Sequence, residues 1–380
     1  MRAPVPSLIY LDTMAMTDPE PFGRFFLPGP TEVRREILEA QLHPMIGHRG
    51  KGMEELMSRI QPGLQRVFRT ARPVYVATAS ATGFMEGAIR NGARRRVLSL
   101  VNGAFSERFH AIARACGVTA DRLDVPWSEA HTPAALADAL DGKDYDAITV
   151  VHSETSTGVL NPIQELTAAA HDAGDIAVLV DSVTGIAGAP TETDAWHLDF
   201  ILTGSQKALA LPPGLAFGVA AEPLLARARA NPGRGVYFDF LEFEKSCAAN
   251  QTPNTPALSL LYALAAQLER IDAEGIEVRW ARHAAMARRT WEWVAEMREL
   301  GIALTLPVVE RSRSPTVTCI ALPPGASSAP VVAELKKRGF VIGAGYGKMK
   351  DTQLRIGHMG DHTVAELDTL LDSLRTVLRP

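Results

Sequence analysis

The sequence predicts an α/β fold, with a large domain built on a mostly parallel sheet and a smaller α+β domain after it. Between Pro73 and Ala221, short β-branched runs alternate with helical stretches, as they do in strand–helix–strand units. After about Pro256 this alternation ends and long helices come first. A chain of 380 residues has room for two domains. We place them at 21–265 and 266–380, after a tail at 1–20.

Six apolar runs predict the strands of the large domain. These are Val74–Thr78, Val97–Val101, Ala147–His152, Ile176–Asp181, Phe200–Thr203 and Leu215–Ala220. Four stretches between them have apolar residues at helical spacing. These are Ala81–Asn91, Ser106–Cys116, Thr132–Leu140 and Pro162–Ala173. Runs without polar alternation are typical of parallel sheets covered on both faces, so we expect ligands at the carboxyl ends of the strands.

The last third of the chain predicts a small sheet flanked by helices. The expected helices are Leu258–Ile271, Ile276–Leu300 and Thr363–Leu378. The expected strands are Thr316–Ala321, Val341–Gly343 and Gln353–Ile356. Strands that follow a long connecting helix indicate a second domain of the α+β class.

Composition excludes several classes of protein. Apolar residues make up 46% and charged residues 22% of the chain, which excludes a disordered or collagen-like protein. A net charge of −4 without a long basic run argues against a nucleic-acid partner, and no apolar run is long enough to predict a membrane segment. Three scattered cysteines and an amino terminus without a signal-peptide pattern lead us to expect a cytoplasmic protein.

Two candidate chemical groups lie at strand ends. Lys207 closes the polar turn Thr203–Lys207 directly after an apolar strand. Loss of solvation there would lower its pKa and make its amine a nucleophile suited to Schiff-base chemistry, although most lysines are simply solvated. Asp181 ends another apolar run. Its carboxylate suits a metal ligand, a general base, the partner of a ring-nitrogen cation or a helix cap, and position alone favours none of these.

Three more strand ends carry polar or aromatic groups. Ser80, Ala81 and Thr82 open a helix, whose free backbone amides can bind a phosphate; an ordinary capped helix is the alternative. Phe105 follows a second strand, and the hydroxyl cluster Ser153–Thr157 follows a third. Pyridoxal phosphate requires a lysine, a carboxylate, an aromatic ring and phosphate donors. The combination therefore predicts this cofactor.

These segments resemble the class V aminotransferases, fold-type I enzymes that use pyridoxal phosphate and include the alanine–glyoxylate and serine–pyruvate aminotransferases. The resemblance begins near Phe26 and covers nearly the whole chain. The motifs that carry it are Gly204–Ala208 with Pro212–Gly214, Val180–Val183, Glu154–Leu160 and Leu354–Gly357. The resemblance implies a large domain with a mostly parallel, seven-stranded sheet.

The resemblance also implies roles at the cofactor. Lys207 would carry the cofactor as a Schiff base and move the proton of the substrate Cα. Asp181 would keep the pyridine nitrogen protonated, while Phe105 and Val183 would cover opposite faces of the ring. Thr155 would lie near the ring hydroxyl. The residues expected to hold the phosphate are Ser80, Ala81, Thr82 and Gln206, with alanines at positions 79 and 81 where the family pattern usually has glycine.

Substrate contacts follow from the same resemblance. Arg355 matches the arginine that grips the substrate carboxylate, because its planar fork binds both oxygens at once. Gly29, in the segment Phe26–Thr31, is expected beside the substrate. Arg49 lies in an early loop that approaches the active site in this family, where it could favour a second carboxylate. An exposed loop arginine is the alternative.

Assembly and metal content complete the predictions. The segment Gln251–Pro256 resembles one that reaches into the phosphate site of a neighbouring subunit. Thr252 and Thr255 are therefore expected to bind cofactor in a homodimer with shared active sites. No histidine and carboxylate cluster has convincing ligand spacing, so we expect no metal.

The leading prediction is ping-pong transfer of an amino group from alanine or serine to glyoxylate or pyruvate. Arg49 leaves open an acidic donor, such as aspartate or 2-aminoethylphosphonate. A lyase or desulfurase on the same fold is a further alternative, but desulfurases need a loop cysteine and Cys319 lies in an apolar strand. An idle, cofactor-bound regulatory protein would fit better if Lys207 or Arg355 were missing, and both are present.

Overall fold

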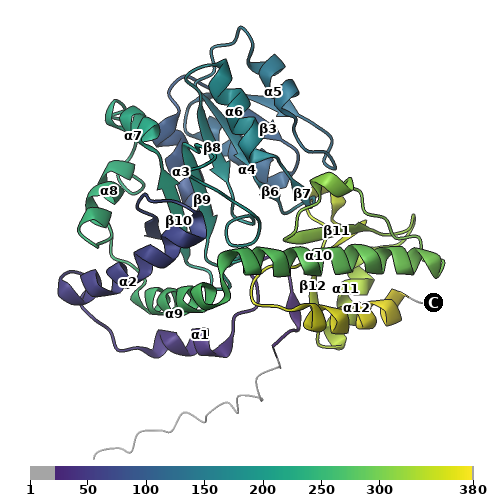
Figure 1. Cartoon of the computed structure of the whole chain (residues 1–380). Coiled ribbons are helices and arrows are strands. Elements are labelled where there is room, and N and C mark those ends of the chain that lie inside the picture. The colour runs from purple at the N-terminus through teal and green to yellow at the C-terminus, as the bar shows by residue number, and fades with distance from the viewer. Residues whose placement is uncertain (1–21, 379–380) are drawn as a thin grey trace, which may run out of the picture.

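The structure is a computed structural model that describes residues 22–378, so the expected tail at 1–20 lies outside the described residues. Seven strands form the sheet of the large domain, in the order β2-β10-β9-β8-β5-β3-β4 (Figure 1). The strands are β2 (Tyr75–Thr78), β3 (Arg96–Val101), β4 (Thr119–Asp124), β5 (Ala147–Val151), β8 (Ala177–Asp181), β9 (Phe200–Gly204) and β10 (Leu215–Ala220). β10 runs antiparallel to β2 and β9, and the other neighbouring pairs are parallel. The predicted α/β fold with a mostly parallel sheet is confirmed.

Eight helices pack around this sheet or against its covering layers. They are α2 (Lys51–Phe68), α3 (Ala81–Gly92), α4 (Ala104–Ala115), α5 (Pro133–Leu140), α6 (Ile163–Ala173), α7 (Glu222–Arg229), α8 (Phe240–Ala248) and α9 (Leu258–Glu274). Helices α2, α5, α6 and α9 share one hydrophobic cluster with the sheet, and α3, α4, α7 and α8 share the other. In β8, Val178 and Val180 belong to the first cluster and Leu179 to the second. This alternation follows from the two-residue period of a strand and buries both faces.

The small domain has its own sheet and core. Its strands are β1 (Phe25–Phe26), β11 (Val317–Ala321), β12 (Val341–Ala344) and β13 (Gln353–Gly357), in the order β1-β12-β13-β11. Its helices are α10 (Ile276–Glu299), α11 (Ser328–Lys337) and α12 (Val364–Leu378). Figure 1 shows α10 running from beside α9 along the small-domain sheet. β1 pairs in parallel with β12, with Phe25 opposite Val341, so the second sheet includes a segment from the 21–265 range.

Short elements complete the chain. They are α1 (Arg35–Glu39), β6 (Ser153–Glu154), β7 (Val159–Leu160) and the 3₁₀ turns η1 (Ala40–Leu42), η2 (Glu310–Ser312) and η3 (Gly347–Met349). None of the helices within residues 22–378 combines the length and the hydrophobicity that crossing a lipid bilayer requires.

Candidate active site

A cavity of about 350 Å³ lies beside the carboxyl ends of β5, β8 and β9. Its walls come from the large domain, from the segment before α1 and from the loop between β12 and β13. Ten residues singled out from the sequence line it: Gly29, Ser80, Ala81, Thr82, Phe105, Thr155, Asp181, Val183, Gln206 and Lys207. The parallel topology explains this convergence, because parallel strands end at the same edge of a sheet.

Lys207 lies in the turn after β9 and is buried. Its Nζ donates a hydrogen bond to the carbonyl of Pro28, and its own carbonyl accepts one from Thr31 Oγ1 at 3.0 Å. The chain at Gly29 passes so close that a Cβ there would lie 2.6 Å from Lys207 Cε. Burial, helped by the charge of Arg355, lowers the pKa of Lys207 to about 8. An amine with this pKa is available as a base or nucleophile near neutral pH.

Asp181 is the last residue of β8 and is buried beside the cavity. Burial raises its pKa to about 7, although the Val183 amide, which donates to Oδ1 at 2.8 Å, opposes this shift. A cation placed against this carboxylate would restore its charge. The site is therefore suited to a protonated ring nitrogen.

The amino end of α3 provides an anion site. Ser80 precedes the helix, and its side chain makes no capping hydrogen bond. The amides of Ala81 and Thr82 begin the helix, where backbone N–H groups have no intrahelical acceptor. These amides lie at the cavity wall with the side chains of Thr82 and Gln206. Free amides at a helix amino end attract phosphate.

Phe105 lies in the first turn of α4, which is held by a buried carboxylate that sequence reasoning missed. Glu154 is fully buried, and Oε1 accepts from the Phe105 amide at 3.3 Å while Oε2 accepts from the Ser106 amide at 3.0 Å. Its two oxygens also accept from the hydroxyls of Ser106 and Ser156. Glu154 lies in a polar segment of the sequence, and nothing there indicated that it caps α4, which begins fifty residues earlier.

Tyr346 and Arg108 also line the cavity and were not singled out from the sequence. The Tyr346 ring stacks on Phe105 with centroids 5.4 Å apart, and Arg108 Nη2 lies 3.4 Å from its hydroxyl. The guanidinium of Arg108 also lies over the Phe105 ring at 4.9 Å. The signal for Tyr346 was an aromatic between Gly345 and Gly347, just after a predicted strand.

Arg355 projects from β13 toward the same region. Its Nε donates to the carbonyl of Ala344 at 2.8 Å, its Nη1 to that of Thr155 at 3.3 Å, and its Cζ lies 5.2 Å from the centre of the Tyr346 ring. Burial lowers the pKa of Arg355. Arg355 is not among the residues that line the cavity. Tyr346, whose ring lies against the Arg355 guanidinium, does line it.

Arg49, Thr252 and Thr255 lie away from this cavity. Arg49 donates to the carbonyls of Thr252 and Pro253 at 2.6 and 2.9 Å, so it holds the segment that was expected to reach a partner subunit. Thr252 is buried and Thr255 is exposed. Within this chain, Arg49 contacts the segment that carries Thr252 and Thr255, and none of the three residues lines the cavity beside Lys207.

The model of the class V aminotransferase family matches residues 38–351 of the chain. The chain belongs to this family. The family uses pyridoxal phosphate, and the site fits that cofactor: the free amides of α3 suit its phosphate, Asp181 its ring nitrogen and Lys207 its aldehyde. The predicted family, enzyme class and cofactor are confirmed.

Similar proteins match nearly the whole chain, and two of the following three are named as aminotransferases. An uncharacterized aminotransferase of Methanocaldococcus jannaschii is 39% identical, with 88% of this chain and 87% of the relative covered. A protein named as the small subunit of a soluble hydrogenase of Synechococcus is 32% identical, with 93% and 92% covered. The serine–glyoxylate aminotransferase of Methylorubrum extorquens is 31% identical, with 92% and 89% covered.

Solved structures agree. The aspartate aminotransferase of subgroup IV from Thermus thermophilus has a TM-score of 0.85 at 31% identity, covering 93% of this chain and 99% of that one. The alanine–glyoxylate aminotransferase of Nostoc has a TM-score of 0.88 at 27% identity, covering 96% and 97%. The chain is thus a fold-type I aminotransferase that acts on amino acids and oxo acids.

Proposed function

We propose that the protein transfers the amino group of a small amino acid, alanine or serine, to glyoxylate or pyruvate in a ping-pong reaction. The observation that carries this proposal is the convergence of Lys207, Asp181 and Phe105 on one cavity, with Arg355 behind Tyr346 at its edge. A lysine, a carboxylate, a stacking ring and a carboxylate-binding arginine are the groups that amino-group transfer requires.

The residues that would hold the cofactor line the cavity and would contact five parts of it. Lys207 would bind its aldehyde carbon, Asp181 its ring nitrogen, and Phe105 one face of its ring opposite Val183. Thr155 would lie near the hydroxyl of the cofactor ring. In the structure, the side-chain hydroxyl of Thr155 is 2.5 Å from that of Thr184. The residues that would hold the phosphate are Ser80, Ala81, Thr82 and Gln206.

The bound cofactor supplies an electron-withdrawing ring that stabilises negative charge on the substrate Cα. The chain supplies the rest. Arg355 binds the substrate carboxylate and so turns the Cα–H bond toward Lys207, whose neutral amine takes the proton. Asp181 is charged when it faces the protonated ring nitrogen of the cofactor, and its charge would keep the proton on that nitrogen. Asp181 and Lys207 are buried and Arg355 is half-buried, which limits the access of water to the reacting carbon.

Tyr346 supports a small donor. Its ring contacts both Phe105 and the guanidinium of Arg355, so a long donor side chain would have to displace it. The names of two similar proteins, the serine–glyoxylate and alanine–glyoxylate aminotransferases, agree with this size. Cys319 does not support the desulfurase alternative, because it lies in β11 and burial raises its pKa to about 12.

Aspartate is the second candidate donor, and Arg108 favours it. Apart from Lys207, Arg108 is the cation on the cavity wall, and the ion pairs of residues 22–378 include none to it. A donor carboxylate that replaced the 3.4 Å contact to Tyr346 would gain a charged partner. The similarity to the Thermus aspartate aminotransferase agrees with this reading.

Half-reaction spectroscopy tests the function. The purified protein, loaded with pyridoxal phosphate, is mixed with one amino acid at a time without any oxo acid, and the cofactor absorption is followed. We expect alanine or serine to bleach the visible band, and Lys207→Ala to lack the band. Bleaching by aspartate alone, abolished in Arg108→Gln, would instead establish the acidic donor. A stable band with every amino acid tested would contradict the proposal.

We also propose that the active unit is a homodimer. Five of the eight large apolar side chains exposed in residues 22–378 lie in two short segments, Leu38–Met45 and Val236–Tyr237. Clusters of this kind are typical of surfaces that a second subunit covers. Arg49 donates a hydrogen bond to the Thr252 carbonyl and so holds segment 251–255 in place. This supports the predicted contribution of the segment to a shared site.

A further inference from the structure

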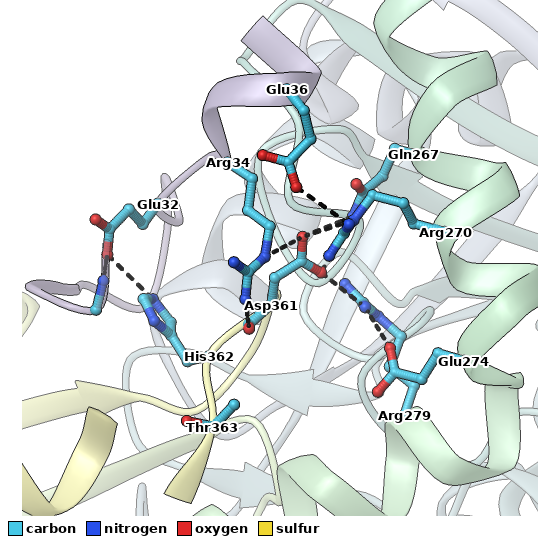
Figure 2. Close-up of polar contacts among 12 residues, drawn as sticks. Glu32, Arg34, Glu36, Gln267, Arg270, Glu274, Arg279, Asp361, His362 and Thr363 are labelled. Atoms are coloured by element: carbon cyan, nitrogen blue, oxygen red, sulfur yellow. Dashed lines mark hydrogen bonds and ion pairs between the residues drawn. The ribbon is translucent and has the colours of Figure 1, made fainter. Parts of the chain in front are cut away.

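An ion-pair network with a buried centre, Arg279 and Asp361, lies behind the turn that carries Lys207, outside the cavity. We call it the Asp361 network; its members are Arg34, Gln267, Arg270, Glu274, Arg279 and Asp361 (Figure 2). Figure 2 shows that they come from the segment before α1, from α9 and α10, and from the loop after β13. None of these six residues lines the cavity.

Asp361 is the centre of the network. Its carboxylate lies 2.8 Å from Arg279 Nη1, 3.6 Å from Arg34 Nε and 4.0 Å from Arg270 Nε, and Gln267 donates to both of its oxygens. Burial raises the pKa of Asp361, but the charge and hydrogen bond of Arg279, the hydrogen bond of Gln267 and the charge of Arg270 together outweigh burial, and the pKa lies below its usual value. The aspartate is therefore ionised at neutral pH and holds three arginines.

Arg279 connects the network to the lysine turn. It is 1% exposed, and its Nη2 donates to the carbonyl of Ala208 at 2.7 Å while its Nη1 serves Asp361 and Glu274. Ala208 follows Lys207 directly in the chain. With Thr31 Oγ1 on the Lys207 carbonyl, two consecutive carbonyls of this turn are held from outside the turn.

The same network is tied to the strand of Arg355. Asp361 follows β13 by four residues, and its backbone carbonyl accepts from Arg34 Nη2 at 3.0 Å. The neighbouring carbonyl of Gly360 accepts from His283 Nε2 at 2.9 Å and from Arg282 Nη1 at 3.1 Å. The loop after β13 and the lysine turn are thus bonded to residues about one turn apart on α10, Arg282 and His283 for the loop and Arg279 for the turn.

We propose that Arg279 and Asp361 are positioning residues, which set the backbone of the Lys207 turn relative to the strand that carries Arg355. The inference rests on the proposed roles of Lys207 and Arg355. Among the hydrogen bonds and ion pairs of residues 22–378, those of Arg279 alone join the two parts directly, because its fork bonds Asp361 through one nitrogen and Ala208 through the other. A lysine keeps the charge but lacks that fixed two-way geometry.

This geometry is hard to explain by stability alone. A buried ion pair recovers little more than the cost of removing its charges from water, and apolar residues of similar volume often stabilise a protein as well. The direction of the Arg279 fork, however, fixes one backbone carbonyl beside the candidate catalytic lysine. A shift of about 1 Å in such a group can reduce a rate about a hundredfold.

Arg279→Lys and Asp361→Asn test the inference in the full-length holoprotein. We expect kcat of the half-reaction to fall about tenfold or more in each, with a smaller change in KM. We also expect a shift of at least half a unit in the pH midpoint at which apoprotein captures pyridoxal phosphate. The second readout does not depend on turnover, and a purely structural role would leave it unchanged.

Arg227→Lys is the matched control. Arg227 is a buried arginine that also donates to backbone carbonyls, those of Gly92, Asp146 and Asp175, at a site remote from the cavity. We expect it to lower the melting temperature comparably, with kcat and the capture midpoint unchanged. Equal behaviour of Arg279→Lys and Arg227→Lys in all readouts would overturn the inference.

Two further results keep the test decisive. If Arg279→Lys does not fold, Asp361→Asn carries the test, because the amide keeps the size and one acceptor of the aspartate; wild-type kcat and capture midpoint in that variant would overturn the inference. Failure of the proposed aminotransferase function would give a different result. In that case wild type would lack a cofactor band that depends on Lys207, before any network variant is compared.

Discussion

Lys207 and Asp181 both have pKa values shifted toward neutral pH. Burial lowers the pKa of Lys207 to about 8 and raises that of Asp181 to about 7. Each charge is also stabilised by the other, so the two shifts are smaller than burial alone would cause. Two groups that titrate near neutrality can change charge when a ligand arrives. This is the property that a cofactor site with a proton-transferring lysine requires.

The first prediction concerns the pH at which apoprotein captures pyridoxal phosphate. The neutral amine of Lys207 is the reactive form, so the rate should rise with pH and level off above about 8. Between pH 7 and 9 we expect an increase of about tenfold. Stopped-flow absorption measures it, with Lys207→Ala as the blank. A rate that still rises between pH 9 and 10 would show an ordinary lysine.

The second prediction concerns Tyr346, whose ring lies against the guanidinium of Arg355. Tyr346→Ala removes this contact, which is worth about 1 kcal/mol, so we expect KM for the amino donor to rise about fivefold. Tyr346→Phe keeps the ring and should stay near wild type. Steady-state kinetics of both variants provide the comparison. If Phe and Ala behave alike, the hydroxyl contact to Arg108 matters more than the ring.

The residues that sequence analysis predicted and those it missed differ in a physical way. Asp181 ends an apolar strand and Lys207 lies in the turn directly after another, and a strand end in a parallel sheet has a known place in space. Tyr346 and Glu154 gain their roles from contacts with α4, far away in the chain. The glycines beside Tyr346 marked its loop in the sequence, but a single sequence does not show that this loop or Glu154 contacts α4.

At the scale of elements, α4 depends on a carboxylate from a different part of the chain. Glu154 accepts hydrogen bonds from the Phe105 and Ser106 amides and is fully buried. Because a carboxylate at a helix amino end also meets the positive end of the helix dipole, its interaction is favourable. The ring of Phe105 is therefore placed by the strand-end segment that also carries Thr155.

The third prediction follows for Glu154→Gln. The amide would turn an NH₂ group toward buried N–H and O–H donors, so we expect the free energy of unfolding to fall by about 2 to 3 kcal/mol. Urea denaturation of the apoprotein measures it. Glu165→Gln, in the exposed first turn of α6, is the control and should change stability by less than about 0.5 kcal/mol. Equal effects of both changes would mean that burial of Glu154 is unimportant.

Several elements were not predicted, and each has a local reason. β4 lies at the edge of the sheet, where one side of the strand is solvated. Its sequence, Thr-Ala-Asp-Arg-Leu-Asp, is therefore polar and does not form an apolar run. α2 contains Pro62 and Gly63, which normally oppose a helix. Gly63 is nevertheless suited to its place, since a Cβ there would lie 3.0 Å from Leu268 of α9. Packing between helices decided this element, not propensity.

At the scale of the whole molecule, the fourth prediction is a dimer that is needed for activity. Leu42 and Val236 are 82% and 91% exposed in the isolated chain. We expect sedimentation of wild type to give twice 41.0 kDa, and Leu42→Glu with Val236→Glu to give an inactive monomer. Burying two new charges at an interface opposes association.

Val278→Glu is the control for this experiment. Val278 is also an exposed apolar residue, but it lies on α10 and belongs to neither of the two segments. The variant should remain dimeric and active. A wild-type monomer with full activity, or an active monomer from the double variant, would contradict the shared-site proposal.

The pairing of β1 with β12 has a consequence for biosynthesis. Phe25 and Phe26 leave the ribosome early, but their partners Val341 and Ile342 follow near the end of translation. At typical elongation rates the interval is on the order of tens of seconds. Throughout it, Phe26, a core residue of the small domain, has no sheet to join. The segment Phe25–Phe26 therefore stays without its partner strand for most of the synthesis of the chain. We expect chaperones that bind apolar segments of nascent chains to bind it during this interval.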